Sequence, residues 1–136
     1  MKPIWIVDDD QSIRFVLEKA LLRENLPTRS FTNPREVLAA LEDSSDDDSQ
    51  GPQILVSDIR MPGGSGLDLL EKVKARLPGL PVIIMTAFSD LDSAVSAFQG
   101  GAFEYLPKPF DLPKAVELIR RAVEESQREE VAEERM

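Results

Sequence analysis

PIWIVDDDQS, residues 3–12, runs from a short apolar segment straight into an acidic triplet. Four apolar residues, Ile4–Val7, precede Asp8, Asp9 and Asp10. At about 4 Å and an effective dielectric constant near 20, two carboxylates repel each other by about 4 kcal/mol. The sequence therefore raises the question of what makes three adjacent carboxylates tolerable at the end of a buried strand.

Similar apolar runs recur along the chain and alternate with helical periodicity. After Ile4–Val7 we expect strands at 28–31, 53–57, 81–86 and 102–106. Helices should follow these strands, beginning near Ile13, at Pro34, at 65–68, at 89–92 and at Asp111. Continuous apolar strands that alternate with helices are typical of a parallel sheet covered on both faces. The sequence therefore predicts an α/β fold with one doubly wound, five-stranded parallel sheet in the order 2-1-3-4-5.

The composition limits the class of protein. The chain has 136 residues, 42% hydrophobic and 30% charged, which fits one domain with a buried core. No apolar run approaches the roughly 18 residues of a membrane span, and the N-terminus turns acidic too early for a signal peptide. There is no cysteine, which removes disulfides and thiolate chemistry. We expect a cytoplasmic protein.

The charge balance indicates what this segment does not bind. It has 16 basic and 25 acidic residues, a net charge of −9, whereas phosphate contacts to nucleic acid need a basic face. We therefore expect no direct nucleic-acid binding. The chain also lacks histidine, so any phosphohistidine chemistry must come from a partner.

Polar residues follow several of the expected strands. Asp8 and Asp9 end the first strand, Asp58 ends the third, Thr86 ends the fourth, and Lys108 follows the fifth. Ligands of open parallel sheets bind at the carboxyl ends of the strands. The sequence thus predicts one pocket that holds carboxylates, a hydroxyl and an ammonium group.

This set of side chains fits magnesium and phosphoryl chemistry. Magnesium prefers oxygen ligands and also binds phosphoryl oxygens, while Thr86 and Lys108 can bind further phosphoryl oxygens. A carboxylate can itself be phosphorylated, and Asp58 is the natural candidate because it lies on the central strand. Each residue alone also fits a structural role as a helix cap, turn former or surface lysine, so the hypothesis depends on the combination.

Four motifs extend this pattern: VDDD (7–10), LVSDIRMPGGSGLDLL (55–70), VIIMTA (82–87) and LPKPF (106–110). With them, residues 3–123 resemble the receiver domains of two-component response regulators, which have a flavodoxin-like fold. SDIRMP and the stretch from MTAFSD to LPKPF resemble nitrogen-regulatory regulators of the NtrC type in particular. In that type the receiver controls an ATPase that activates sigma-54 RNA polymerase.

The resemblance implies a role for each site residue. Asp58 would accept a phosphoryl group from a sensor histidine kinase. Magnesium would be held by Asp8, Asp9, Asp58 and the backbone carbonyl of Arg60, with Asp9 a direct ligand. The domain would act as a switch and not as an enzyme, beyond catalysing its own phosphorylation and slow dephosphorylation.

Further positions carry over in the same way. Thr86 and Lys108 would bind the phosphoryl group, Tyr105 matches an aromatic switch position, and the Lys108–Pro109 bond would be cis. Asp10 is an additional acidic residue after the pair that the family usually has at this place, and we assign it to helix capping. The helix after Thr86 carries more apolar residues than one buried face of a helix requires. The sequence leaves open whether all of them belong to the core.

The resemblance also predicts the domain layout and partners. Residues 1–123 would be the receiver, and 124–136 an acidic helical extension or the start of a linker to an absent effector domain. The acidic loop 42–51 looks longer than usual and should be mobile. Expected partners are the kinase, a second receiver and the downstream ATPase domain.

One enzyme class is an alternative. Phosphatases of the haloacid-dehalogenase type resemble this chain in an Asp-x-Asp after the first strand, a Thr after an apolar strand and a downstream Lys. Asp8 would then be the nucleophile. That class needs a further acidic metal motif after Lys108, where the only aspartate is Asp111, beside a helix start.

Overall fold

The structure is a computed structural model that describes residues 2–43, 51–61, 64–87, 91–108 and 110–134. Its main sheet has five parallel strands in the order β2-β1-β3-β6-β7. These strands are β1 (Ile4–Val7), β2 (Thr28–Phe31), β3 (Ile54–Asp58), β6 (Val82–Ala87) and β7 (Glu104–Lys108). Counted along the main sheet, this is the predicted 2-1-3-4-5 order, so the predicted fold is confirmed.

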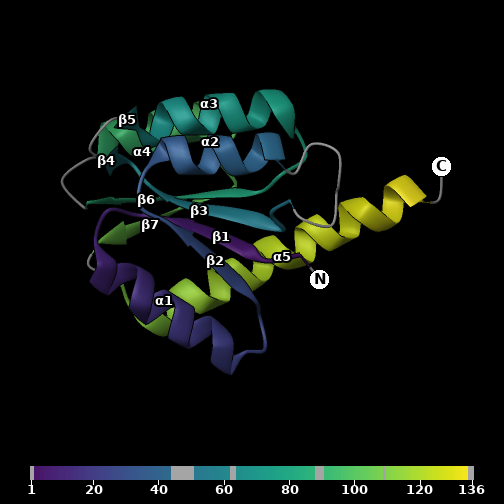
Figure 1. Ribbon diagram of the computed structural model, residues 1–136, viewed down its shortest axis with the longest axis horizontal. Helices are drawn as coiled ribbons and strands as arrows, with labels where there is room; N and C mark the ends of the chain where they lie inside the picture. The colour runs from purple at the N-terminus through teal and green to yellow at the C-terminus, as the bar shows by residue number, and fades with distance from the viewer. Residues whose placement is uncertain (1, 44–50, 62–63, 88–90, 109, 135–136) are drawn as a thin grey trace.

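Helices cover both faces of the sheet (Figure 1). They are α1 (Gln11–Arg23), α2 (Pro34–Asp43), α3 (Gly66–Arg76), α4 (Leu91–Gln99) and α5 (Leu112–Glu134). Helices α2, α3 and α4 lie on one face, and α1 and α5 lie on the other. A small antiparallel pair, β4 (Arg60–Met61) with β5 (Gly64–Ser65), follows β3 and was not predicted.

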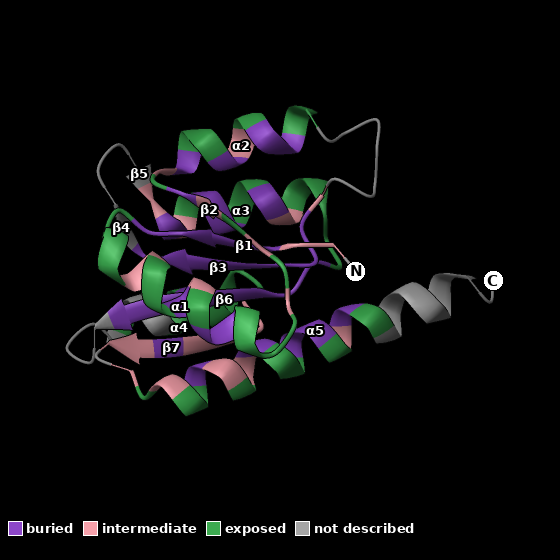
Figure 2. Cartoon of the chain, turned by 60° about the horizontal axis from the view of Figure 1, so that its bottom comes forward, coloured by how far each residue is buried: buried purple, intermediate pink, exposed green. Residues whose placement is uncertain are grey.

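Successive side chains of each strand point to opposite faces of the sheet and pack into two separate hydrophobic cores. In β1, Ile4 and Ile6 pack toward α1 and α5, whereas Trp5 and Val7 pack toward α2 and α3. All four are fully buried, and Figure 2 shows the same for the inner strands as a whole. Burying one large apolar side chain is worth about 1.5–3 kcal/mol, so this alternation holds helices on both faces.

Trp5 has an unusual environment within the core. Its ring lies 5.0 Å from that of Phe31, and the guanidinium of Arg29 lies 5.5 Å from its ring centroid. Its indole Nε1 is buried, and within the described part of the chain it has no hydrogen-bond partner. Apolar and π contacts therefore hold this side chain in place.

Polar caps start the helices close to the predicted positions. Asp10 is the N-cap of α1 and accepts a hydrogen bond from the Ser12 N–H, so its predicted capping role is confirmed. Ser65 caps α3. Each cap satisfies an N–H group that has no partner within its helix, and the caps thereby fix where the chain turns back from a strand.

The fifth main strand begins later than predicted. The expected range was 102–106, but β7 is Glu104–Lys108. The turn after α4 extends further, because Gly101 adopts a φ of 99° and the Ala102 N–H still bonds to the Ala97 carbonyl. Strand β7 stands at the sheet edge, where a proline such as Pro107 is tolerated. Lys108 therefore ends the strand instead of following it.

A buried polar cluster anchors α5 near the amino end of β3, the central strand of the sheet. The Gln53 side-chain amide donates to the Ser126 hydroxyl at 2.7 Å, and that hydroxyl donates to the Val123 carbonyl. The backbone N–H of Lys2 donates to the other end of the Gln53 amide. Helix α5 thus stays attached to the sheet beyond residue 123. Among the described residues, no helix has both the length and the apolar character to cross a bilayer.

Most of the acidic loop predicted at 42–51 is outside the described residues, and its first two residues belong to the end of α2. Residues 44–50 are not described, so the predicted mobility of 42–51 stays a prediction. The division at residue 123 into a receiver and an extension also remains a proposal, although α5 continues as one helix to Glu134.

Candidate functional site

Three carboxylates meet at the carboxyl edge of the main sheet. Asp8 directly follows β1, Asp58 is the last residue of β3, and Asp9 is the next residue after Asp8. One oxygen from each of the three lies within 4.8 Å of the others. Asp8 and Asp58 are buried, while Asp9 is exposed. The topology therefore gathers residues that are 50 positions apart, as the strand-end pattern predicted.

Lys108 places a positive charge between the two buried carboxylates of the cluster. Its Nζ lies 2.9 Å from Oδ2 of Asp8 and 3.2 Å from Oδ1 of Asp58. Burial alone would lower the pKa of Lys108, but its hydrogen bond to Asp8 and the charge of Asp58 outweigh this, so the pKa is raised. Lys108 therefore stays protonated and bridges the two buried carboxylates.

The Asp58 carboxylate is held by two contacts on one oxygen. Oδ1 accepts the Ile59 N–H at 2.9 Å and pairs with Lys108, and neither contact uses Oδ2. Burial and then the nearby charge of Asp8 raise the pKa of Asp58, while Lys108 and the Ile59 N–H oppose the shift. Asp58 is thus a fixed carboxylate whose charge is stabilised less well than usual, and no described residue is seen to bind its Oδ2.

Thr86 and Tyr105 lie on the neighbouring strands. Thr86 is buried near the end of β6, and Tyr105 is partly buried in β7. The Tyr105 ring packs edge-on against Phe98 of α4, with centroids 5.6 Å apart. Phe98 is 43% exposed and Val95 is 55% exposed, so these two apolar side chains of α4 are not core.

The backbone after Asp58 is tightly packed. Arg60 forms β4 and pairs with Ser65, and the Gly66 N–H bonds to the Ile59 carbonyl at 2.7 Å. A Cβ on Gly66 would lie 2.2 Å from the Asp58 carbonyl oxygen, so only glycine fits. This requirement explains the last glycine of GGSG (63–66), a pattern that sequence analysis considered only as a weak candidate for a phosphate-binding loop. Pro109 is outside the described residues, so the cis bond stays a prediction.

The donor set fits a hard divalent cation. Three carboxylates with oxygens within 4.8 Å of one another match the oxygen ligands that magnesium prefers. Two of them also pair with the ammonium of Lys108, which offsets part of their charge. The arrangement can therefore hold a cation next to Oδ2 of Asp58, which the contacts described above do not use.

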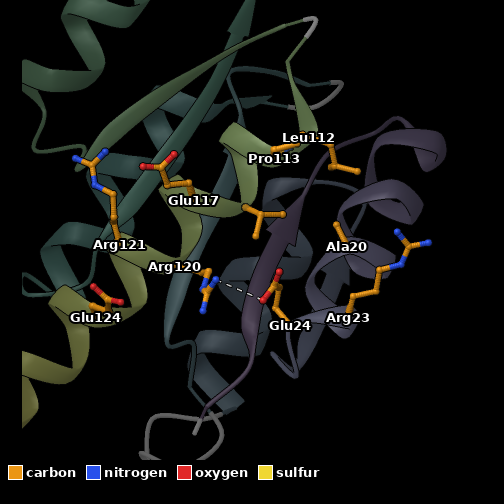
Figure 3. Close-up of a pocket in the computed structure, with 10 residues that line it drawn as sticks. Ala20, Arg23, Glu24, Leu112, Pro113, Glu117, Arg120, Arg121 and Glu124 are labelled. Carbon is orange, nitrogen blue, oxygen red and sulfur yellow. Dashed lines mark ion pairs between the residues drawn. The ribbon is translucent and has the colours of Figure 1, made fainter.

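A separate hollow lies between α1 and α5 (Figure 3). Its volume is about 510 Å³, and Leu112, Pro113 and Ala20 form part of its apolar lining. Arg120 and Glu24 also line it and form an ion pair of 3.5 Å with each other. None of the lining residues belongs to the carboxylate cluster, so this hollow is distinct from the site.

Sequence reasoning missed Arg14. This residue lies in α1, and its guanidinium Nη1 donates to the backbone carbonyl of Asp8. A cation one turn after an acidic triplet was the available signal, but the contact itself depends on how α1 leaves the strand.

Comparison with known proteins identifies the family. The profile described as "Response regulator receiver domain" matches residues 4–120. The DNA-binding transcriptional regulator NtrC of Salmonella typhimurium is 57% identical over 127 residues, which is 93% of this chain and 26% of that protein. The response regulator protein PilR of Pseudomonas aeruginosa is 41% identical over 118 residues, or 87% of this chain and 25% of that protein. The chain thus spans about a quarter of the length of these relatives.

Solved structures agree with this result. The apo receiver domain of NtrC matches with a TM-score of 0.79 at 56% identity, covering 93% of this chain and 97% of that one. Its BeF3-activated form gives 0.74 at the same identity, covering 93% and 99%. The receiver domain of NtrX from Brucella abortus gives 0.80 at 32% identity, covering 89% and 98%. The chain therefore belongs to the response regulator receiver domain family.

Proposed function

We propose that this chain is a phosphorylation-activated switch in which Asp58 accepts a phosphoryl group from a sensor histidine kinase. The observation that carries the proposal is the cluster of Asp8, Asp9 and Asp58 bridged by Lys108. In the transfer, an oxygen of Asp58 forms a bond to phosphorus while the bond from phosphorus to the donor breaks. The donor leaves with its electron pair, and Asp58 becomes an acyl phosphate.

Magnesium, when bound, would neutralise the phosphoryl oxygens and the carboxylates around them. Asp8, Asp9, Asp58 and the Arg60 carbonyl would hold it. Asp8 and Asp9 present a double negative charge that would otherwise repel a phosphoryl group of charge about −1.5 to −2. Phosphorylation is therefore expected to require the metal.

Lys108 and Thr86 would bind the transferred group. Lys108 already lies 3.2 Å from Oδ1 of Asp58, so its ammonium can turn toward a phosphoryl oxygen without crossing the site. Thr86 lies on the adjacent strand, and its hydroxyl can donate to another oxygen. The site holds Asp58 in place through the Ile59 N–H, which orients the attacking carboxylate.

The signal would leave the site through α4 and β7. Movement of the Thr86 hydroxyl toward the phosphoryl group would alter the space next to Tyr105, which packs on Phe98 of α4. Val95 and Phe98 are partly exposed and give α4 an apolar surface for a partner. We infer that α4 and β7 exchange between two conformations and that phosphorylation of Asp58 favours one of them.

The similarity to NtrC suggests the downstream role. We infer a cytoplasmic regulator whose receiver controls a sigma-54-dependent ATPase and a DNA-binding region, in nitrogen regulation. A second receiver is the expected dimer partner. Residues 124–136 would then lead toward the effector domain, and the segment itself would act as a regulatory domain and not as an enzyme.

The alternative dehalogenase-type phosphatase is disfavoured by Asp10. In that class Asp8 and Asp10 would act together, but the Asp10 side chain caps α1 through the Ser12 N–H. Asp9 and Asp58, in contrast, join Asp8 in the cluster.

Intact mass spectrometry after incubation with magnesium and acetyl phosphate tests the proposal. We expect one labile phosphoryl adduct in the native protein and none in Asp58→Asn. The matched control Asp68→Asn, at an exposed position of α3, should be modified normally. An adduct that survives in Asp58→Asn would reject Asp58 as the acceptor. So would peptide mapping that places the phosphoryl group of the native protein on Asp8. If Asp8→Asn also loses the adduct, the same mapping of the native protein tells whether Asp8 was a magnesium ligand or the phosphorylated residue.

A further inference from the structure

The backbone carbonyl of Asp8 has a partner that the sheet does not provide. The pairings of β1 end at Val7, which is aligned with Phe31 on β2 and Ser57 on β3. The carbonyl of Asp8 therefore lies beyond the last aligned pair. Arg14, in the first turns of α1, donates its Nη1 to this carbonyl.

With this contact, every polar atom of Asp8 is engaged. Its N–H bonds to the Phe31 carbonyl at 3.2 Å, and its Oδ1 accepts the Asp10 N–H at 2.9 Å. Its Oδ2 accepts Lys108 at 2.9 Å, and its carbonyl accepts Arg14. Asp8 is thus held at four points, of which Arg14 is the only one that fixes the peptide plane leading into Asp9.

The orientation of this peptide plane determines where Asp9 points. Asp9 is exposed, and it joins the carboxylate cluster from the chain segment between β1 and α1. A rotation of the Asp8–Asp9 peptide would move the Asp9 carboxylate away from Asp8 and Asp58. Small displacements of this kind matter, because ligand-orienting partners outside the first coordination shell typically change metal affinity by about 10–100-fold.

We propose that Arg14 is a positioning residue of the magnesium site, which acts through the Asp8 carbonyl to aim the Asp9 carboxylate. This inference rests on the proposed function, because it assigns the cluster to a divalent cation. It adds a residue from α1 that neither touches the cation nor belongs to the motif residues at the strand ends.

Two simpler roles make different predictions. If Arg14 acted only through its charge, its removal would tighten cation binding, since a guanidinium near the site repels a divalent cation. If Arg14 only stabilised the fold, its removal would lower the midpoint of unfolding and leave the affinity of the folded protein unchanged. Positioning predicts weaker binding, and the sign of the change therefore separates the three roles.

The test compares magnesium dissociation constants, measured by backbone NMR titration, for three variants. In Arg14→Met we expect about a tenfold weakening or more, whereas Arg14→Lys, which keeps a donor and the charge, should recover most of the affinity. Arg23→Met, a control at the other end of α1, should bind as the native protein does. Unchanged or tighter binding in Arg14→Met would overturn the inference. If that variant does not fold, Arg14→Leu, which also lacks a donor, takes its place with the same expectation.

A second measurement needs no metal. The Asp10 N–H donates to Oδ1 of Asp8, so its hydrogen exchange reports whether Asp8 stays in place. Exchange should be faster in Arg14→Met than in the native protein and nearly native in Arg14→Lys. Equal exchange in all of them would contradict the positioning role. If the native protein bound no magnesium, the proposed function would fail, while this exchange experiment would still decide whether Arg14 fixes Asp8.

Discussion

Replacing Lys108 by methionine should destabilise the fold when no divalent cation is present. The side chain keeps its length and apolar stem but loses the ammonium that lies 2.9 Å from Asp8 and 3.2 Å from Asp58. At an effective dielectric constant near 20, these two contacts contribute about 6 and about 5 kcal/mol of Coulomb attraction. The two carboxylates would be left facing each other.

The net loss is smaller than these attractions. Placing Lys108 in the site already costs several kcal/mol of desolvation, and breaking a buried pair by removing one partner typically costs about 3–5 kcal/mol. Lys108 is 25% exposed, so water screens part of the interaction, and we expect the lower end, about 3 kcal/mol. For a domain of this size that corresponds to a decrease of about 10 °C in the midpoint of thermal unfolding.

Urea unfolding followed by circular dichroism measures this loss. The double variant Lys108→Met/Asp58→Asn should recover most of it, because it removes one of the two uncompensated carboxylates. Added magnesium should also restore stability in the single variant, since a cation would neutralise the same groups. Lys72→Met, at an exposed position of α3, serves as the control. A loss below about 1 kcal/mol, or no recovery in the double variant, would refute the bridging role of Lys108.

Three further predictions concern Asp58, Gly66 and Gln53. Burial raises the pKa of Asp58 in the folded protein above its ordinary value. Between the pKa of Asp58 in the unfolded chain and its higher pKa in the folded protein, the folded state binds more protons, so the free energy of unfolding falls as pH rises through this range. Asp58→Asn should therefore unfold a few degrees higher at neutral pH in metal-free buffer, with a gain that shrinks on acidification in calorimetric scans. Gly66→Ala forces a Cβ to within 2.2 Å of the Asp58 carbonyl oxygen and should cost about 1–3 kcal/mol in urea unfolding. Gln53→Ala removes the buried partner of Ser126 and should cost about 1–3 kcal/mol, with increased hydrogen exchange in the second half of α5.

The sequence predicted the features that depend on local pattern. Apolar runs and helical periodicity gave the strand order, and the polar residues at strand ends gave the positions of Asp8, Asp58 and Lys108. These inferences succeed because parallel strands bring their carboxyl ends to the same edge whatever the details of packing. Asp10 was assigned correctly as a cap because capping depends on neighbouring residues only.

Other features depend on three-dimensional packing and could not be predicted. The phosphoryl-binding role of Lys108 stays a prediction. Its ammonium also bridges Asp8 and Asp58, and this bridge could not be predicted because it depends on the distance between β1 and β3. The Arg14 contact depends on the angle at which α1 leaves β1. The cluster of Gln53 and Ser126 joins residues 73 positions apart, and no local pattern indicates such a pair.

The environment of Trp5 gives the protein an intrinsic optical probe. Trp5 is the only tryptophan in the chain, and its fully buried indole has no hydrogen-bond partner among the described residues. An indole in apolar surroundings emits at shorter wavelength than one in water, so unfolding should produce a single red shift. Because the ring packs against Phe31 on the α2 and α3 side, its emission would report the integrity of that core separately from charge rearrangements around Asp58. Fluorescence of the native sequence can therefore follow folding, whereas events at the carboxylate edge would need an added label.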